Sequence, residues 1–156
     1  MTRTSRAFIP VSGRAVYLID TNVVSEIRKG HKADAGVRKF FADVAASQVQ
    51  VFLSVITVGE LRRGVALIHH RGDALQARRL ERWLQSILTD FAGNVLDVDA
   101  DIAQLWGQLC APRAENALDK LIAATALIHG LTVVTRNGRH FGATGVPLLN
   151  PFSDDR

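Results

Sequence analysis

The feature that most constrains the fold is a short apolar run that ends abruptly in an acid, residues 16–20 (VYLID). Four consecutive large or β-branched residues without polar alternation predict a strand buried on both faces, as in a parallel sheet covered by helices. Ligands of open α/β sheets bind beyond the carboxyl ends of the strands, so Asp20 stands where a functional group is expected. An Asp is equally suited to cap the helix that starts near Asn22. The run by itself leaves both roles of Asp20 open.

Segments typical of strands and of helices alternate along the rest of the chain. A second buried strand is expected at 50–55, and further strands at 94–98, 131–135 and 146–149. Helices are expected at 22–28, 33–47, 56–70, 73–93, 99–110 and 117–129. Gly30 and Gly93 are expected to stop helices, 136–145 to be a loop, and Cys110 to be a core residue. This alternation predicts βαβ units with right-handed crossovers. The expected fold class is therefore α/β, with helices on both faces of a mostly parallel sheet of four to five strands.

The length and composition predict one globular domain. A chain of 156 residues can bury a substantial core, and we expect a single domain at 16–152, with tails at 1–15 and 153–156. No apolar stretch approaches the roughly 20 residues of a spanning helix, and a single cysteine fits a reducing compartment. We therefore expect a cytoplasmic protein with no membrane partner. The net charge of +4 is compatible with a polyanionic partner but does not require one.

Three acids stand out by their position relative to the expected strands. Asp20 follows the first strand, Glu60 lies on the helix after the second, and Asp119 begins the helix before the fourth. All three can face one end of a parallel sheet, where grouped carboxylates imply a bound cation or raised pKa values. Oxygen ligands suit Mg²⁺ or Mn²⁺, which would support phosphodiester cleavage. Thr21 and Thr135, each after a strand, are suited to orient a water or a ligand, and equally to ordinary turn and cap roles.

Four blocks of the sequence resemble the PIN domain family. They are residues 18–26 (LIDTNVVSE), 58–64 (VGELRRG), 119–126 (DKLIAATA) and 134–141 (VTRNGRHF). Their order and spacing are most similar to the VapC and FitB branch, the ribonuclease toxins of type II toxin–antitoxin pairs, over about residues 16–152. The resemblance implies a three-layer α/β/α sandwich and an Mg²⁺- or Mn²⁺-dependent endoribonuclease. It further implies catalytic metal ligands at Asp20, Glu60 and Asp119.

The same resemblance implies the partners of the protein. An RNA substrate, a cognate antitoxin protein and a homodimer are expected, and a higher-order toxin–antitoxin complex is compatible with them. DNA is expected only indirectly, through the antitoxin. Because phosphate contacts do not distinguish RNA from DNA, action on DNA as a complex with a DNA-binding antitoxin stays an alternative.

The chain departs from the family pattern in the fourth block. The family usually has an acid just before the Phe, where this chain has His140. An imidazole is a softer, neutral ligand, so a second cation is expected to bind more weakly or only at higher pH, with Asn137 supplying a carbonyl oxygen or a water contact in compensation. We therefore hypothesise a three-carboxylate site with activity that favours Mn²⁺ over Mg²⁺. The substitution keeps a second reading open, a catalytically weakened PIN-fold module that binds RNA or an antitoxin without cutting.

Basic residues near the acidic blocks are candidates for contacts with RNA phosphates. They are Arg28, Lys29, Arg62, Arg63, Arg136 and Arg139. Such contacts are independent of sequence and weaken as the salt concentration rises. Salt bridges to neighbouring acids explain each of these residues, taken singly, equally well.

Overall fold

The structure, a computed structural model, describes residues 15–153. Its elements in chain order are β1 (Tyr17–Ile19), α1 (Thr21–Ile27), the 3₁₀ turn η1 (Gly30–Lys32), α2 (Ala35–Ser47), β2 (Val51–Ser54), α3 (Val55–His70), α4 (Ala74–Asp90), β3 (Val95–Leu96), α5 (Ala100–Cys110), α6 (Ala117–His129), β4 (Thr132–Val134), α7 (Gly138–Phe141), the 3₁₀ turn η2 (Gly142–Thr144) and β5 (Leu148–Leu149). The expected tails lie outside the described residues, except for Ala15 and Ser153. No helix within residues 15–153 combines the length and the apolar character needed to cross a membrane.

The five strands form one sheet in the order β3-β2-β1-β4-β5, and all neighbouring strands are parallel. The central strand is β1, in which Leu18 pairs with Phe52 of β2 on one side and with Val133 of β4 on the other. From β1 the chain first builds β2 and β3 on one side and then crosses to build β4 and β5. The strand order thus reverses at β1, which is the place where open α/β sheets bind ligands. The predicted parallel sheet is confirmed.

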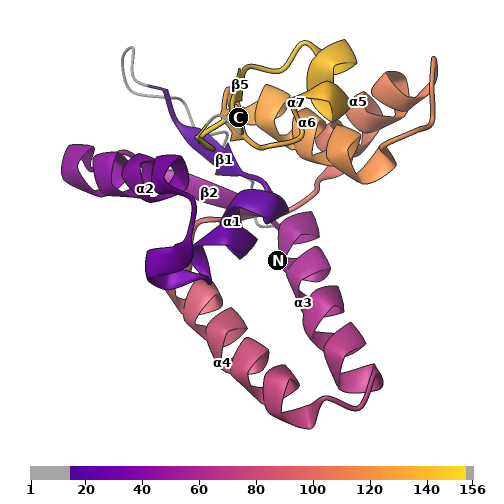
Figure 1. The fold of residues 1–156 in the computed structure, drawn as a ribbon. Helices are drawn as coiled ribbons and strands as arrows, with labels where there is room; N and C mark the ends of the chain where they lie inside the picture. The colour runs from indigo at the N-terminus through magenta and orange to yellow at the C-terminus, as the bar shows by residue number, and fades with distance from the viewer. Residues whose placement is uncertain (1–14, 154–156) are drawn as a thin grey trace.

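Successive side chains of a strand point to opposite faces of the sheet. Because the central strands carry consecutive apolar residues, both faces of the sheet are apolar. Leu18 and Val133 join one core together with residues of α6 and α7, and Ile19 and Val134 join a second core with residues of α1 to α4. Figure 1 shows α5, α6 and α7 gathered on one side of the sheet, away from α1, α3 and α4. The molecule is therefore an α/β/α sandwich, as predicted.

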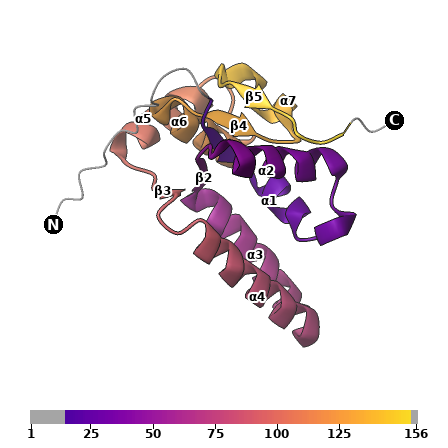
Figure 2. The ribbon, with the colours of Figure 1, turned by 90° about the vertical axis from the view of Figure 1, so that its left-hand side faces the viewer.

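Helices α3 and α4 form a long hairpin that extends away from the sheet (Figure 2). Helix α3 starts directly after β2, where the Ser54 hydroxyl accepts a hydrogen bond of 3.1 Å from the Ile56 amide. Asp73 caps α4 in the same way through the amide of Gln76, at 3.1 Å. Because α3 follows β2 without a loop, its first turns lie at the carboxyl edge of the sheet.

The expected loop at 136–145 is wrong, since this segment contains α7 and η2. The side chain of Phe141 has no exposed surface and belongs to the core beside α6. Glycines at 138 and 142 give the segment little helix propensity of its own, so the packing of Phe141 decides its conformation.

Three further predictions are also wrong: the helix ends expected at Gly30 and at Gly93, and the place of Cys110 in the core. Helix α1 ends at Ile27, and Gly30 instead opens η1 with a φ of +58°. Helix α4 ends at Asp90, before Gly93, in a turn in which the Phe91 amide donates to the Ile87 carbonyl. Cys110 is only partly buried, because it is the last residue of α5.

Candidate active site

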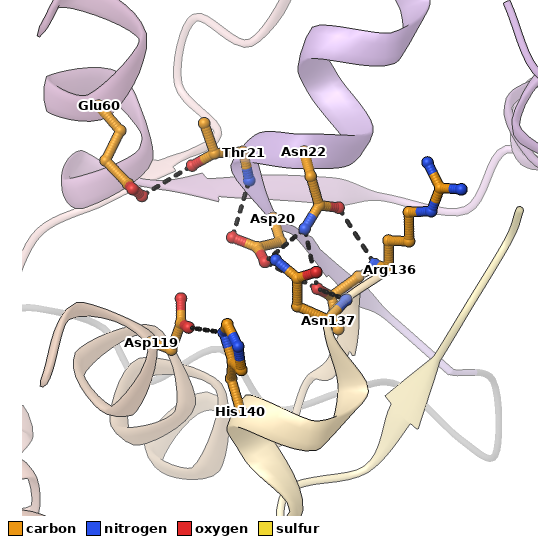
Figure 3. Close-up of polar contacts among 9 residues, drawn as sticks. Asp20, Thr21, Asn22, Glu60, Asp119, Arg136, Asn137 and His140 are labelled. Carbon is orange, nitrogen blue, oxygen red and sulfur yellow. Dashed lines mark hydrogen bonds and ion pairs between the residues drawn. The ribbon is translucent and has the colours of Figure 1, made fainter. Parts of the chain in front are cut away.

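The three acids singled out in the sequence gather at the carboxyl edge of the sheet (Figure 3). Asp20 directly follows β1, Glu60 lies in the second turn of α3, and Asp119 lies in the first turn of α6. The negative charges of both Glu60 and Asp119 act on Asp20. The site therefore lies where the strand order reverses, with one acid from each of three segments that are far apart in the sequence.

Asp20 is the buried member of the group, with 3% of its surface exposed. Its Oδ1 accepts a hydrogen bond of 2.8 Å from the Thr21 amide, so it caps α1, and its Oδ2 accepts one of 2.8 Å from the Thr135 hydroxyl. Burial raises the pKa of the Asp20 carboxyl above its ordinary value of 3.8, the hydrogen bonds from Thr135 and Thr21 oppose that rise, and the charges of Asp119 and Glu60 add to it. Asp20 is thus a helix cap and also a carboxylate whose negative charge is destabilised.

Glu60 is held through Thr21. The Thr21 hydroxyl donates a hydrogen bond of 2.8 Å to Oε1 of Glu60, and it also lies 3.3 Å from the hydroxyl of Thr57. Thr21 therefore ties α1 to α3 at the rim of the site and fixes one oxygen of the Glu60 carboxylate. This is an orienting contact of the kind that the sequence suggested for Thr21.

Asp119 is held by His140. The two side chains approach across α6 and α7, with Nδ1 of His140 2.8 Å from Oδ2 of Asp119 (Figure 3). The side chain of His140 is 45% exposed and that of Asp119 is 21% exposed. The residue that replaces the usual fourth acid thus contacts one of the three acids directly.

Asn22 is a site residue that the sequence reasoning missed. Its amide nitrogen donates to Oδ2 of Asp20 and to the Thr135 hydroxyl, each at 3.2 Å, and its amide oxygen accepts from the Arg136 backbone at 3.1 Å. The backbone amide of Asn137 donates to the Thr135 hydroxyl at 3.0 Å. The one signal in the sequence was the position of Asn22, two residues after the acid that ends β1.

The donor set fits a hard divalent cation. Asp20, Glu60 and Asp119 offer only carboxylate oxygens, and a cation among them would offset the repulsion from Asp119 and Glu60 that adds to the effect of burial on the pKa of Asp20. Within residues 15–153, no group of three or more Asp, Glu, His or Cys side chains is already arranged to hold an ion. The carboxylates are instead held by hydrogen bonds from Thr135, Thr21 and His140. The three acids are therefore gathered at one edge of the sheet, but their carboxylates are not arranged around a common point as ligands of an ion.

The basic residues considered for RNA contact differ in their surroundings. Arg62 forms a bidentate ion pair with Glu81 that joins α3 to α4, and Lys29 pairs with Glu26 at 2.7 Å. The guanidinium of Arg136 lies 4.6 Å from the centre of the Phe152 ring.

Arg28 is placed differently from these residues. It lines a groove of about 380 Å³ that also includes Thr21 and Glu60, and that runs between α3 and α4 to Trp83. The side chains of Arg63 and Arg139 are exposed. Of the six basic residues, Arg28 shares a groove with one of the three acids.

Fold and site together define a class of protein, a parallel α/β sandwich with an acidic centre at the switch point of its sheet. Comparison with known proteins agrees: the PIN domain family matches residues 17–146. The chain belongs to the PIN domain family.

Individual relatives lie in the branch that the four sequence blocks indicate. The chain is 38% identical over 143 residues to the toxin FitB of Neisseria gonorrhoeae, covering 88% of this chain and 99% of FitB. It is 34% identical over 142 residues to the VapC ribonuclease Y4jK of Sinorhizobium fredii, covering 86% of this chain and 96% of that protein. Among solved structures, FitAB bound to an IR36 DNA fragment matches with a TM-score of 0.75 and 35% identity, covering 90% of this chain and 99% of that one. The predicted resemblance to the FitB and VapC branch is confirmed.

Proposed function

We propose that the protein is a metal-dependent endoribonuclease that acts as the toxin of a toxin–antitoxin pair. The relatives named toxin FitB and VapC ribonuclease Y4jK support this proposal. The observation that carries it is the gathering of Asp20, Glu60 and Asp119 at the carboxyl edge, where two negative charges act on a third, buried carboxylate. Such grouped negative charges destabilise the folded state unless a bound cation offsets their repulsion.

In this proposal Asp20, Glu60 and Asp119 hold Mg²⁺ or Mn²⁺. A divalent cation at such a site neutralises charge on a phosphate oxygen and activates water for attack. Thr135 orients Asp20, and Thr21 orients Glu60. Because this site has three carboxylates, with His140 in the place of a fourth, we propose that activity is higher with Mn²⁺ than with Mg²⁺.

RNA is proposed to reach the acids along the groove that contains Arg28, Thr21 and Glu60. The guanidinium of Arg28 is suited to hold a backbone phosphate there, without reading the base sequence. For Arg62 and Lys29 the structure gives partners within the chain, so their contribution to RNA binding is proposed to be small.

We further propose a cognate antitoxin as partner, a homodimer as the functional unit, and DNA contact only through the antitoxin. The support is the solved complex of FitAB with a DNA fragment, which has the same fold over 90% of this chain. A higher-order toxin–antitoxin complex is compatible with that arrangement.

A second candidate function is a binding module with the same fold that no longer cuts RNA. Two observations favour it: the histidine at position 140, and the absence within residues 15–153 of a group of acids already arranged around an ion. The two functions differ in one measurable outcome, which is whether the purified chain cleaves RNA.

The test incubates the purified chain, free of any partner, with structured RNAs in Mn²⁺ and, separately, in Mg²⁺. An Asp20→Asn variant removes the buried charge and keeps a residue that caps helices well. An Asp97→Asn variant is the matched control, because Asp97 is exposed between β3 and α5. Cleavage by the parent and by Asp97→Asn, but not by Asp20→Asn, supports the nuclease. RNA binding without cleavage by all three proteins supports the binding module.

A further inference from the structure

His140 occupies a constrained position beside the acids. It lies on α7, a helix of four residues, directly before Phe141, whose side chain has no exposed surface. The His140 amide also donates to the Asn137 carbonyl at 2.9 Å. The backbone of His140 is therefore anchored in the core, while its ring is free to reach α6, where Nδ1 meets Oδ2 of Asp119 at 2.8 Å.

The chemistry of this contact determines which nitrogen carries the hydrogen. An ionised carboxylate offers only acceptor oxygens, so the Nδ1 atom of His140 must donate to Asp119. A ring nitrogen that carries a hydrogen has no lone pair for a cation. In this geometry, Nδ1 of His140 cannot act as a metal ligand.

The contact also leaves the two carboxylate oxygens of Asp119 in different surroundings. Its Oδ2 is engaged by His140, whereas its Oδ1 has no hydrogen-bond partner among the described residues. Hydrogen bonds to the outer atoms of ligating groups fix the orientation of those groups and tune the affinity for the ion. One oxygen of Asp119 is thereby held, and the other is left available.

We propose that His140 is a positioning residue: through Nδ1 it holds Oδ2 of Asp119 so that Oδ1 is presented to the cation, and it is not itself a ligand. This inference rests on the proposed function for the presence of a cation at the acids. It goes beyond that function by giving the residue in place of the fourth acid a role of its own. The site then binds one cation per chain, through three carboxylates.

Three substitutions separate a positioning residue from a ligand. His140→Asn places an amide nitrogen where Nδ1 stands and removes Nε2, His140→Leu removes both nitrogens, and His140→Asp introduces the usual acid. We expect isothermal titration with Mn²⁺ to give one ion per parent chain. We expect an affinity for His140→Asn within a few-fold of the parent, and a loss of about 10- to 100-fold for His140→Leu.

Other titration results would overturn the inference. Equal losses for His140→Asn and His140→Leu would make Nε2 a ligand, and a His140→Leu variant as tight as the parent would leave the contact without effect on the ion. A second tight Mn²⁺ on the parent would also contradict it, whereas a second ion gained only by His140→Asp agrees with it. Thermal unfolding of each variant without metal checks that the fold is intact.

A spectroscopic measurement tests the same contact in the parent chain. Nitrogen-15 spectra of the His140 ring at one fixed pH are expected to show a protonated Nδ1 both before and after the addition of Mg²⁺. A large Mg²⁺-induced shift of either ring nitrogen into the range of a coordinated imidazole would overturn the positioning role. Failure to cleave RNA by a chain that binds Mn²⁺ as described would contradict the proposed nuclease and leave the role of His140 intact. Absence of Mn²⁺ binding by the parent would overturn that role.

Discussion

The Thr135 hydroxyl, at the end of β4, donates a hydrogen bond of 2.8 Å to Oδ2 of Asp20, at the end of β1. The same hydroxyl accepts hydrogen bonds from the Asn22 side chain at 3.2 Å and from the Asn137 backbone at 3.0 Å. Thr135 is 1% exposed. One buried hydroxyl therefore fixes the central acid and joins the two strands that meet at the switch point of the sheet.

Replacement of this hydroxyl by a methyl group should affect both stability and the titration of the acid. Thr135→Val keeps the shape but removes the buried hydrogen bond to Asp20 and the acceptor of two partly buried hydrogen bonds, from Asn22 and Asn137, so we expect a loss of about 1–3 kcal/mol in the free energy of unfolding. It also removes a hydrogen bond that lowers the pKa of Asp20, so that pKa should rise. Urea unfolding and carbon-13 titration of the Asp20 carboxyl measure the two effects. Thr135→Ser, which keeps the hydroxyl, should stay near the parent in both measurements.

Charge on Asp20 should destabilise the chain in the absence of metal. Its folded pKa lies above the ordinary 3.8, so the folded state binds the proton more tightly than the unfolded state does. The resulting penalty is fully present above the folded pKa and disappears as the pH falls below about 3.8. We therefore expect Asp20→Asn to unfold at a higher urea concentration than the parent at pH 7.5, with a gap that narrows toward pH 4. A gap that widens on acidification would contradict the assigned direction.

Divalent cations should reverse this order of stability and make the parent more stable than Asp20→Asn. A cation that binds only the folded parent stabilises it by about 2.7 kcal/mol at 100 times its dissociation constant. Asp20→Asn loses one of three proposed ligands and should gain much less. Thermal unfolding with and without Mn²⁺ measures the difference, and Asp97→Asn should respond like the parent, because Asp97 is exposed and is not among the acids whose charges act on Asp20. Equal gains for the parent and Asp20→Asn would argue against a cation at Asp20.

The parts that the sequence predicted are those governed by local rules. The unbroken apolar run before Asp20 specifies a strand covered on both faces, and the rule that sites lie beyond strand ends brings Glu60 and Asp119 to the same edge. The sheet, the sandwich and the family are confirmed. The assignment of these acids as catalytic metal ligands stays a prediction.

The parts that the sequence did not predict depend on contacts between distant residues. Helix α7 owes its conformation to the burial of Phe141, not to the propensity of its glycine-flanked segment. The contact of His140 with Asp119 joins residues 21 positions apart, and Asn22 reaches Thr135 across 113 positions. No periodicity encodes such distances, so these contacts can be described only once the fold is known.

The carboxylate of Asp34 connects the start of α2 to the C-terminal segment, and the stabilisation from this contact depends on pH. Asp34 caps α2 through the Gly36 amide at 2.8 Å and also accepts from the amide of Ser153 at 2.9 Å and from its hydroxyl. The Ser153 hydrogen bonds are the main cause that lowers the pKa of Asp34 from 3.8 to about 2. Because the folded pKa is depressed, this stabilisation is present above about pH 3.8 and is lost as the pH falls through about 2.

A Ser153→Ala variant should expose this dependence. We expect it to be less stable than the parent at pH 5, with a difference that shrinks toward pH 2 as Asp34 takes up its proton in both proteins. Urea unfolding at a series of pH values provides the measurement. A difference that stays constant from pH 5 to pH 2 would mean that the Ser153 hydroxyl acts independently of the Asp34 charge.

The contact between the start of α2 and the C-terminal segment also requires a glycine at position 36. A Cβ on Gly36 would lie 2.2 Å from the Pro151 carbonyl oxygen and 2.7 Å from the Ser153 amide nitrogen, and both are backbone atoms. Gly36→Ala must therefore displace the C-terminal segment, and we expect a loss of about 1–3 kcal/mol. Gly107→Ala in α5 is the matched control, because its Cβ would meet no atom within 4 Å. There we expect a gain of up to about 1 kcal/mol from the better helix former, so the two unfolding midpoints should shift in opposite directions.

Arg28 and Arg62 should differ in their effect on RNA binding, although both lie near the acidic blocks. Arg28 lines the groove that contains Glu60, whereas the guanidinium of Arg62 is engaged by both carboxylate oxygens of Glu81. On an Asp20→Asn background, which should prevent cleavage, Arg28→Ala is expected to reduce the slope of log affinity against log salt by about 0.7, the value of one phosphate contact on a single strand. Arg62→Ala should leave that slope unchanged. Fluorescence anisotropy of a labelled RNA over a range of salt concentrations measures both slopes, and an equal reduction by the two variants would mean that Arg62 also contacts an RNA phosphate, contrary to this expectation.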